Sequence, residues 1–449
     1  MLGRVVILAI LSTAVRVWLA HHYYGFETGD DVEIAQEAFR AALGLEYTPW
    51  GIRNLFVSNT FVAPLLALAS LSGVTDPFTL ATIARYPFIV FAGINILLVY
   101  FLGRTWFSEQ AGFIAAALYS IHWLPLVFGS SLYPRIPGVT FLLLAALAIA
   151  RQRHFTAGVL ASLAFAMRYS EIVFLAPLYW SAVALPPLSN AAEPLRGTGN
   201  RRQEPPHSIF LGFGTGVMLF VGLYDWLSWG RPFASLIEFA RYTLIARESS
   251  SLMKQQPPWW YLTALPQWLA PPLWPFLWRE RRKALAFIVL PVIALSVIHH
   301  KELRYLQAVI PFATILAAAG VLAWWRDGRR WLVIVLLVLA LPLQLARIRS
   351  IEKRTMAAVD AARTMHSANR VAVSQAWAYG GKLFLRNVEE IGIPPDVTRL
   401  REAAPLVDCV AMYRSQITPE MRAIVAEAGL ATARGFERAR SRPVDVFCR

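Results

Sequence analysis

Charged residues are scarce in this chain of 449 residues. Asp, Glu, Lys and Arg together make up only 16% of the sequence, whereas 57% is hydrophobic and the mean hydropathy is +0.47. A soluble protein carries more charge than this on its surface. The composition therefore excludes an ordinary soluble enzyme and predicts a polytopic membrane protein.

Cysteine is also rare, because only Cys409 and Cys448 occur. No spacing of cysteine or histidine matches a metal site, so we expect no bound metal and no cofactor. Both cysteines lie in segments that are typical of strands. A disulfide in an oxidising compartment and two buried free thiols both remain open.

Acidic residues are outnumbered by basic ones, 28 to 43, which gives a net charge of +15. In a soluble domain this excess would suggest a nucleic-acid partner. Here the basic residues cluster in short loops between apolar runs, where the positive-inside rule accounts for most of them. We therefore expect a membrane partner and no nucleic acid.

Apolar runs recur throughout residues 1–348. A membrane span needs about 20 apolar residues, and by this criterion we expect about eleven transmembrane helices. The expected spans are 4–21, 83–103, 110–129, 137–150, 155–167, 171–186, 208–226, 262–278, 284–298, 305–325 and 331–347.

Alternation from a cytoplasmic N-terminus gives each loop a side. The loops assigned inside are all basic, as the positive-inside rule demands. They contain Arg104, 151–154, 196–202, 279–283 and 326–330. On the outer side, Arg347, Arg349, Lys353 and Arg354 go against this rule. The outer side also holds two long loops, 22–82 and 227–261.

The composition becomes that of a soluble protein over residues 349–449. Short apolar stretches at 371–374, 407–412 and 444–447 predict strands. Thr418 followed by Pro419 predicts the start of a helix over 418–428. We expect a transmembrane domain over 1–348, followed by a small extracytoplasmic α/β domain.

The first outer loop carries an unusual acidic stretch that contains Asp30 and Asp31. Residues 30–44 predict an amphipathic helix that ends at Gly44. Thr28 and Asp31 fit a capping box, which is the simpler interpretation. The alternative is that one carboxylate acts as a general base and the other raises its pKa.

Several cations share the predicted outer side with this stretch. Fixed cations there would stabilise a phosphate that develops negative charge, and a histidine could donate a hydrogen bond to it. The alternative is that they are snorkelling residues at helix ends. The candidates are Arg135, Arg168, His300, Lys301 and Arg304.

Taken in order, these segments resemble the motifs of glycosyltransferase family 22, the polytopic mannosyltransferases of the GT-C superfamily. Thr28-Gly29-Asp30-Asp31 is similar to the His-Pro-Asp-Glu loop of that family. Residues 300–305, His-Lys-Glu-Leu-Arg-Tyr, resemble its His-Lys-Glu-x-Arg-Phe signature, and Arg168-Tyr169-Ser170 resembles its Arg-Pro-Thr turn. The stretch 224–266 is similar to its second long lumenal loop.

The resemblance implies the GT-C fold and an inverting transfer of a sugar, expected to be mannose, from a polyprenyl-phosphate donor to a glycolipid, glycan or protein. It implies that Asp30 is catalytic with Asp31 beside it. It also places His300, Lys301 and Arg304 around the donor phosphate, with Arg168 and Arg135 as further candidates. Residues expected to contact substrate or support the site are Glu37, Asp225, Trp259, Tyr261 and Glu302.

Some features depart from the family. Thr28 and Gly29 replace its His and Pro, and Tyr169 and Ser170 replace its Pro and Thr, which leaves the acceptor open. Trp259 and Tyr261 also fit an interfacial aromatic belt. The short loops suggest a bacterial inner membrane with the site on the extracytoplasmic side. The rival function is a transporter or flippase of a lipid-linked saccharide, which would need ionisable residues at mid-membrane.

Overall fold

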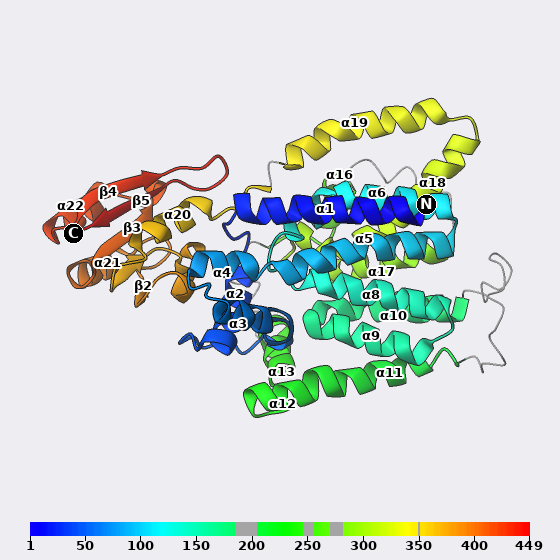
Figure 1. The fold of residues 1–449 in the computed structure, drawn as a ribbon, viewed down its shortest axis with the longest axis horizontal. Coiled ribbons are helices and arrows are strands. Elements are labelled where there is room, and N and C mark those ends of the chain that lie inside the picture. Colours follow the sequence, from blue (N-terminus) through cyan, green and yellow to red (C-terminus); the bar gives the residue numbers. More distant parts are fainter. Residues whose placement is uncertain (185–203, 246–254, 270–281, 349–350) are drawn as a thin grey trace.

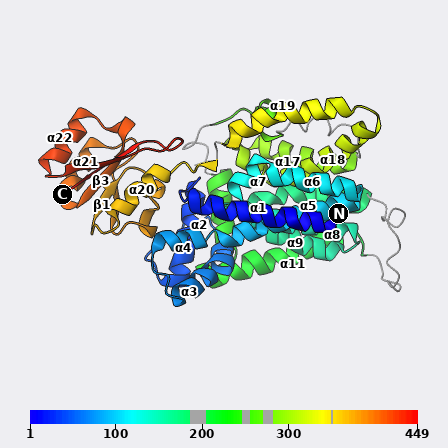
Figure 2. The ribbon, with the colours of Figure 1, turned by 45° about the horizontal axis from the view of Figure 1, so that its top comes forward.

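The computed structural model describes residues 1–184, 204–245, 255–269, 282–348 and 351–449 (Figure 1). Most of the chain forms helices that run alongside one another as a bundle, and a smaller domain lies beyond one end of it (Figures 1 and 2). The bundle helices are α1 (Leu2–His22), α5 (Tyr86–Trp106), α6 (Glu109–Ile121), α8 (Arg135–Ala150), α9 (His154–Met167), α10 (Leu175–Ala184), α11 (Ser208–Val217), α17 (Arg282–Val297), α18 (Ile310–Arg326) and α19 (Arg330–Ile348).

Three helical stretches among the described residues are long and apolar enough to cross a membrane: Leu2–His22, Pro77–Trp106 and Ser208–Trp229. Most of the other expected spans form apolar helices of 10–17 residues, which fall short of this length. The predicted number of eleven spans is therefore not confirmed. The expected span 171–186 illustrates the difference, because it is divided between the 3₁₀ helix η2 (Tyr169–Phe174) and α10. The loop at 196–202 and most of 270–283 lie outside the described residues.

Glycine allows α9 and α11 to pack closely. A Cβ atom at Gly158 would lie 2.0 Å from the carbonyl oxygen of Ile209, and one at Gly212 would lie 2.1 Å from that of Phe155. Small residues of this kind let helix backbones approach each other in membrane proteins. The two helices could not pack this closely with any other residue at these positions.

Short helices collect at the end of the bundle that faces the smaller domain (Figures 1 and 2). They include α2 (Gly29–Leu43), α3 (Ala63–Leu71), α4 (Pro77–Ile83) and α13 (Ala234–Ala240). We call this the α2 end. The predicted amphipathic helix is confirmed in α2, whose apolar residues Val32, Ala35 and Phe39 are buried. It ends at Gly44, which has a φ of 72°, a backbone angle that glycine adopts without strain.

The C-terminal domain contains a five-stranded sheet in the order β2-β1-β3-β5-β4. Its predicted strands are confirmed as β1 (Val371–Val373), β3 (Cys409–Tyr413) and β5 (Val444–Cys448). The predicted helix is α22 (Pro419–Glu427), capped by the Thr418 hydroxyl, which accepts a hydrogen bond from Met421 N–H. The domain also contains four elements that were not predicted from the sequence: β2 (Val388–Glu390), β4 (Ala431–Phe436), α20 (Met356–Met365) and α21 (Val397–Ala403).

The two cysteines occupy facing positions on the antiparallel strands β3 and β5. Their Cα atoms are 4.1 Å apart and their sulfur atoms are bonded. Of the two possibilities that the sequence left open, the structure has the disulfide.

The contacts that attach the C-terminal domain to the α2 end include hydrogen bonds at three places. The Phe26 N–H donates to the Thr355 hydroxyl at 2.7 Å. The backbone N–H of Lys382 donates to Gln36 Oε1 at 3.0 Å. Arg440, between β4 and β5, donates to both carboxylate oxygens of Glu27 at 3.1 Å. The domain therefore holds the chain directly before α2 and one face of that helix.

Candidate active site

Asp30 lies in the first turn of α2 and is surrounded by three arginines. Its Oδ2 atom is 2.9 Å from Nη1 of Arg304 and 3.6 Å from Nη1 of Arg168. Its Oδ1 atom accepts a hydrogen bond from Nη2 of Arg53. We call these four residues the Asp30 cluster. Three guanidinium groups against one carboxylate leave a surplus of positive charge.

Three separate breaks in helical structure bring these arginines together. Arg53 follows α2 in an irregular loop. Arg168 ends α9 with an extended backbone (φ −155°), which turns its side chain toward the α2 end before η2 begins. Arg304 lies in the short 3₁₀ helix η6 (Leu303–Leu306), which connects α17 to α18. Each cation therefore comes from a turn at the α2 end of the bundle.

The surrounding charges set the pKa of Asp30, which is only 9% exposed. Burial raises the pKa, but the opposing attraction of Arg53, Arg168 and Arg304 holds it well below the usual range of a carboxyl group. The sequence analysis expected a neighbouring carboxylate to raise this pKa. That expectation was wrong, because arginines and not Asp31 surround the Asp30 carboxylate.

Asp31 points away from the cluster and caps its own helix. Its Oδ2 atom accepts hydrogen bonds from the N–H groups of Glu27 at 2.8 Å and Thr28 at 3.3 Å, which completes the predicted capping box. Burial raises the pKa of Asp31 to about 6. The simpler interpretation of this residue agrees with its geometry.

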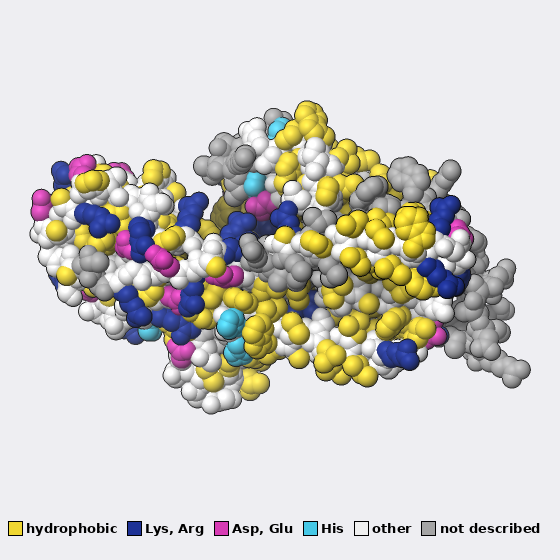
Figure 3. All heavy atoms as spheres, turned by 90° about the horizontal axis from the view of Figure 1, so that it is seen from above, with side chains coloured by type: hydrophobic (Ala, Val, Ile, Leu, Met, Phe, Trp, Pro, Cys, Tyr) yellow, Lys and Arg dark blue, Asp and Glu magenta, His cyan; other side chains and the backbone are white. Residues whose placement is uncertain are grey.

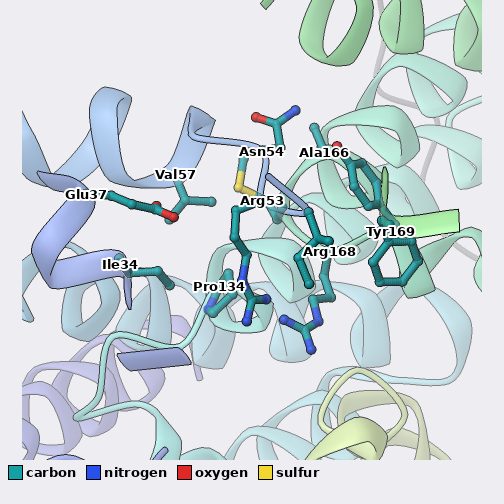
Figure 4. Close-up of a pocket in the computed structure, with 12 residues that line it drawn as sticks. Ile34, Glu37, Arg53, Asn54, Val57, Pro134, Ala166, Arg168 and Tyr169 are labelled. Carbon is teal, nitrogen blue, oxygen red and sulfur yellow. The ribbon is translucent and has the colours of Figure 1, made fainter. Parts of the chain in front are cut away.

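The Asp30 cluster opens into a cavity of about 140 Å³. The cavity is polar where the cluster and His300 line it and apolar where Leu295 and Ile298, at the end of α17, line it. A second opening lies beyond Arg53 and Arg168 and extends to Glu37. Figure 4 shows the guanidinium groups of Arg53 and Arg168 extending in the same direction, with Glu37 at the left, on the other side of Arg53 from Arg168.

Arg135 lines the main cavity but is already paired. Its Nη1 atom is 3.2 Å from the buried carboxylate of Glu171, and its Nη2 atom donates to the hydroxyl of Ser170 at 2.6 Å. It also donates to the carbonyl of Tyr305, whose ring centroid lies 5.1 Å from its guanidinium carbon. Arg135 thus fixes the turn that carries Arg168 to the turn that carries Arg304.

The residues of the turn 300–305 line two different cavities. His300 lines the cavity of the Asp30 cluster, and its Nε2 atom is 3.4 Å from Glu302, which also pairs with Arg304. Lys301 points the other way, into an adjoining cavity. Arg304 lines both cavities. The sequence had grouped His300, Lys301 and Arg304 around one phosphate, but of these three residues only His300 and Arg304 line the cavity of Asp30.

Glu37 is buried on α2 and accepts a hydrogen bond from the Ser58 hydroxyl at 2.7 Å. Burial and the nearby carboxylate of Glu33 raise its pKa to about 8. Glu37 is therefore largely protonated at neutral pH, and it lines the opening behind Arg53.

Three other predicted site residues lie outside the cavity of the Asp30 cluster. Asp225 is buried and accepts hydrogen bonds from the N–H and hydroxyl of Ser235, which stabilises the start of α13. Tyr261 is buried and donates to the carbonyl of Glu302 at 3.3 Å, so it supports the turn 300–305. The side chain of Trp259 is 60% exposed, as an interfacial residue would be.

Arg53 was not predicted from the sequence as a site residue. The signal that could have found it is the one that identified Lys301 and Arg304. A basic residue on the predicted outer side goes against the positive-inside rule, and Arg53 shares its loop with the acidic stretch. The sequence analysis also missed the cations that the C-terminal domain adds near Glu27.

A sequence model described as the Alg9-like mannosyltransferase family matches residues 35–379. GPI mannosyltransferase 3 from Yarrowia lipolytica is 28% identical over 132 residues, which are 28% of this chain and 26% of that protein. The matched stretch thus spans about a quarter of that relative.

Similar solved structures cover nearly the whole chain. ArnT from Cupriavidus metallidurans in the apo state superimposes with a TM-score of 0.60 at 12% identity, covering 99% of this chain and 98% of ArnT. The same protein bound to undecaprenyl phosphate gives a TM-score of 0.57 at 12% identity and the same coverage. The Archaeoglobus fulgidus oligosaccharyltransferase tethered to an acceptor peptide gives 0.53 at 12% identity, covering 97% of this chain and 73% of that one.

These solved structures share the GT-C fold, and the family match extends over most of the chain. The fold and the family agree with the apolar helices described above. The chain is therefore a membrane protein that belongs to the Alg9-like mannosyltransferase family.

Proposed function

We propose that this protein transfers a mannosyl group from a polyprenyl-phosphate donor to an acceptor hydroxyl on the extracytoplasmic side of a bacterial inner membrane. Family membership and the fold shared with ArnT, which has been solved with undecaprenyl phosphate, support the class of reaction. The disulfide between Cys409 and Cys448 supports an oxidising compartment for the α2 end. The observation that carries the proposal is the contact of Asp30 with three arginines.

In this proposal the arginines of the Asp30 cluster hold the donor phosphate. The donor is a phosphodiester with one negative charge, and its leaving group is a phosphate monoester with up to two. Negative charge therefore grows on the phosphate as the bond to the sugar breaks, and fixed guanidinium groups in a partly buried site stabilise it. His300 lies close enough to contribute a hydrogen bond.

Asp30 then acts as the general base. The acceptor oxygen bonds to C1 of the sugar, its proton moves to the Asp30 carboxylate, and the C1–O bond to the phosphate breaks with inversion. A carboxylate held by three arginines is a weak base. A bound phosphate would compete for Arg168 and Arg304, and so would raise the basicity of Asp30 when the donor is in place.

The test is an assay with the full chain in sealed liposomes that contain undecaprenyl-phospho-[³H]mannose. A mannosyltransferase releases undecaprenyl phosphate and moves the label to an acceptor from an extract of membrane glycolipids and glycoproteins. A flippase leaves the glycosidic bond intact. Label that crosses a sealed bilayer while still on the prenyl phosphate, with no prenyl phosphate released, would contradict the proposal.

A further inference from the structure

Glu37 differs from most charged residues of this protein because it is buried. On the face shown in Figure 3, Lys, Arg, Asp and Glu side chains gather on the C-terminal domain and near the ends of the bundle, and the middle of the bundle is mainly hydrophobic. Glu37 is only 3% exposed. Its carboxyl group lines the small opening behind Arg53 and Arg168, which we call the Glu37 pocket (Figure 4).

The Glu37 pocket has room for one small polar group. Its volume is about 40 Å³. A single water molecule needs at least roughly 10–15 Å³, and sites for whole small molecules begin at roughly 300 Å³. The pocket therefore suits a hydroxyl or hydroxymethyl group and is too small for a sugar ring.

The pocket joins the cavity of the Asp30 cluster. Ile52, Arg53, Arg168 and Phe239 line both of them, so a group carried by a molecule in the larger cavity can enter the smaller one. The rest of the pocket is mostly apolar. The side chains that make it so are Ile34, Val57, Pro134, Ala166 and Met167.

Glu37 and Arg53 each bring to this pocket a buried polar atom without a partner. The Oε2 atom of Glu37 accepts from the Ser58 hydroxyl, but its Oε1 atom forms no hydrogen bond within the described part of the chain. Nη2 of Arg53 donates to Asp30, whereas its buried Nε atom finds no acceptor among the described residues. Buried polar groups are normally hydrogen-bonded, so these two atoms call for a partner.

Other polar side chains of the pocket are already bound. Asn54 donates to the carbonyl of Phe220 at 3.1 Å and accepts from the N–H of Phe56 at 2.8 Å. The Tyr169 hydroxyl forms a hydrogen bond with that of Ser235. Neither Asn54 nor Tyr169 therefore competes for the two unpaired atoms.

A hydroxyl group matches both unpaired atoms. It has two lone pairs and one hydrogen, so it accepts from Nε of Arg53 and pairs with Oε1 of Glu37 whether or not Glu37 carries a proton. A phosphate would instead be drawn to the Nη atoms of Arg53 and Arg168, which face Asp30 in the larger cavity. An ammonium group would be repelled by the two guanidinium groups.

We propose that the Glu37 pocket receives one hydroxyl of the mannosyl group of the donor, and so selects the sugar. When Arg53 and Arg168 hold the donor phosphate, one oxygen separates the phosphorus from the sugar ring, which places ring hydroxyls near the pocket that the same arginines line. A sugar without that hydroxyl leaves two buried polar atoms unpaired, which disfavours its binding. This inference rests on the proposed function, because it takes the proposed donor as the occupant.

Deoxy analogues of the donor test this on the unaltered protein. The full chain in nanodiscs is titrated with undecaprenyl-phospho-mannose, with its 2-, 3-, 4- and 6-deoxy forms and with undecaprenyl phosphate. At least one deoxy form should bind at least tenfold more weakly than the parent donor, as expected when a buried hydrogen-bonding site loses its partner. The measurement is of binding alone and requires no turnover.

Glu37→Met shows whether that difference arises at Glu37. Methionine has a similar length but cannot replace the carboxyl group as a hydrogen-bonding partner. The parent donor and the affected deoxy form should then bind the variant equally, and undecaprenyl phosphate should bind as tightly as it does to the wild type. Glu37→Gln should restore most of the discrimination, because its amide still pairs with a hydroxyl. Glu46→Met is the matched control, since Glu46 is exposed and lies outside the pocket lining.

Equal binding of the parent donor and all four deoxy forms would overturn the proposal and mean that the pocket holds only water. Loss of undecaprenyl phosphate binding in Glu37→Met as large as the loss of donor binding would also overturn it, because Glu37 would then act only by positioning Arg53. So would a Glu37→Met protein that keeps the full discrimination. Mannose transfer without any such discrimination would leave the proposed function standing. Selection that depends on Glu37, in a protein that releases no undecaprenyl phosphate, would refute the proposed function and leave the sugar site standing.

Discussion

Nη1 of Arg304 lies 2.9 Å from Oδ2 of Asp30, although 274 positions separate the two residues in the chain. The contact joins the first turn of α2 to the turn that connects α17 and α18. Because the two segments are far apart in the chain, this contact forms only through the tertiary fold.

Replacing Asp30 with Asn should reduce transfer at least a hundredfold, because the amide cannot accept the proton of the acceptor. Donor binding should be retained or become tighter, since the three arginines lose their competing carboxylate. Turnover and undecaprenyl phosphate binding are measured on the same preparation.

Asp31→Asn is the matched control for Asp30→Asn. Its amide oxygen can still accept from the N–H groups of Glu27 and Thr28, so the helix cap and most of the activity should remain. Equal loss of turnover in both variants would mean that Asp30 is not the general base.

Arg53→Gln should weaken the binding of undecaprenyl phosphate by roughly ten- to a hundredfold, the size of one charge-assisted hydrogen bond. Arg53→Lys should restore part of the affinity, because it keeps the charge and loses the forked geometry. Arg53 also holds Asp30, so removing it should raise the pKa of Asp30 toward its usual range. If Arg53→Gln bound the lipid as well as the wild type does, Arg53 would serve only to orient Asp30.

Glu37 should make the stability of the protein depend on pH. Its pKa is about 8 in the folded state against an ordinary value of 4.5, so the folded state keeps a proton that the unfolded state loses first. Stability should therefore fall as the pH rises from about 4.5 to about 8, and this contribution should level off above that.

Glu37→Gln removes this titration and keeps an oxygen for the Ser58 hydroxyl. The difference between its melting temperature and that of the wild type should grow in favour of the variant between pH 5 and pH 8. Thermal unfolding in one detergent at both pH values measures it. A difference that does not change with pH would mean that Glu37 is already ionised in the fold.

Gly212→Ala should destabilise the bundle by separating α9 from α11, because a Cβ atom there would lie 2.1 Å from the carbonyl oxygen of Phe155. Gly214→Ala on the same helix is the control, since a Cβ there meets nothing within 4 Å. The control should be neutral or slightly stabilising, because alanine favours helix over glycine. Melting temperatures of both variants decide the matter, and a Gly212→Ala protein as stable as Gly214→Ala would show that the close packing is not needed.

The sequence allowed prediction of those parts of the site that a local rule exposes. Arg304 and Lys301 were identifiable because basic residues are disfavoured on the outer side, and α2 because its apolar residues follow the helical period. The role of Asp31 was also readable locally, since a capping box needs only four residues.

Features that depend on long-range packing were not predictable in the same way. Lys301 lines only the adjoining cavity, whereas Arg304, in η6, also lines the cavity of the Asp30 cluster, and no local pattern predicts this difference. Arg440 reaches Glu27 because the C-terminal sheet places the connection between β4 and β5 beside the α2 end. The number of spans is not confirmed, because hydropathy alone does not show where a helix breaks, as it does before α10.

Arg440 donates two hydrogen bonds to Glu27, which lies three positions before Asp30. A displacement of the C-terminal sheet would therefore move the short stretch of backbone that positions Asp30. Exchange of this domain between related proteins would have to preserve that tether, and a graft that lacks it would leave the first turn of α2 anchored on one side only.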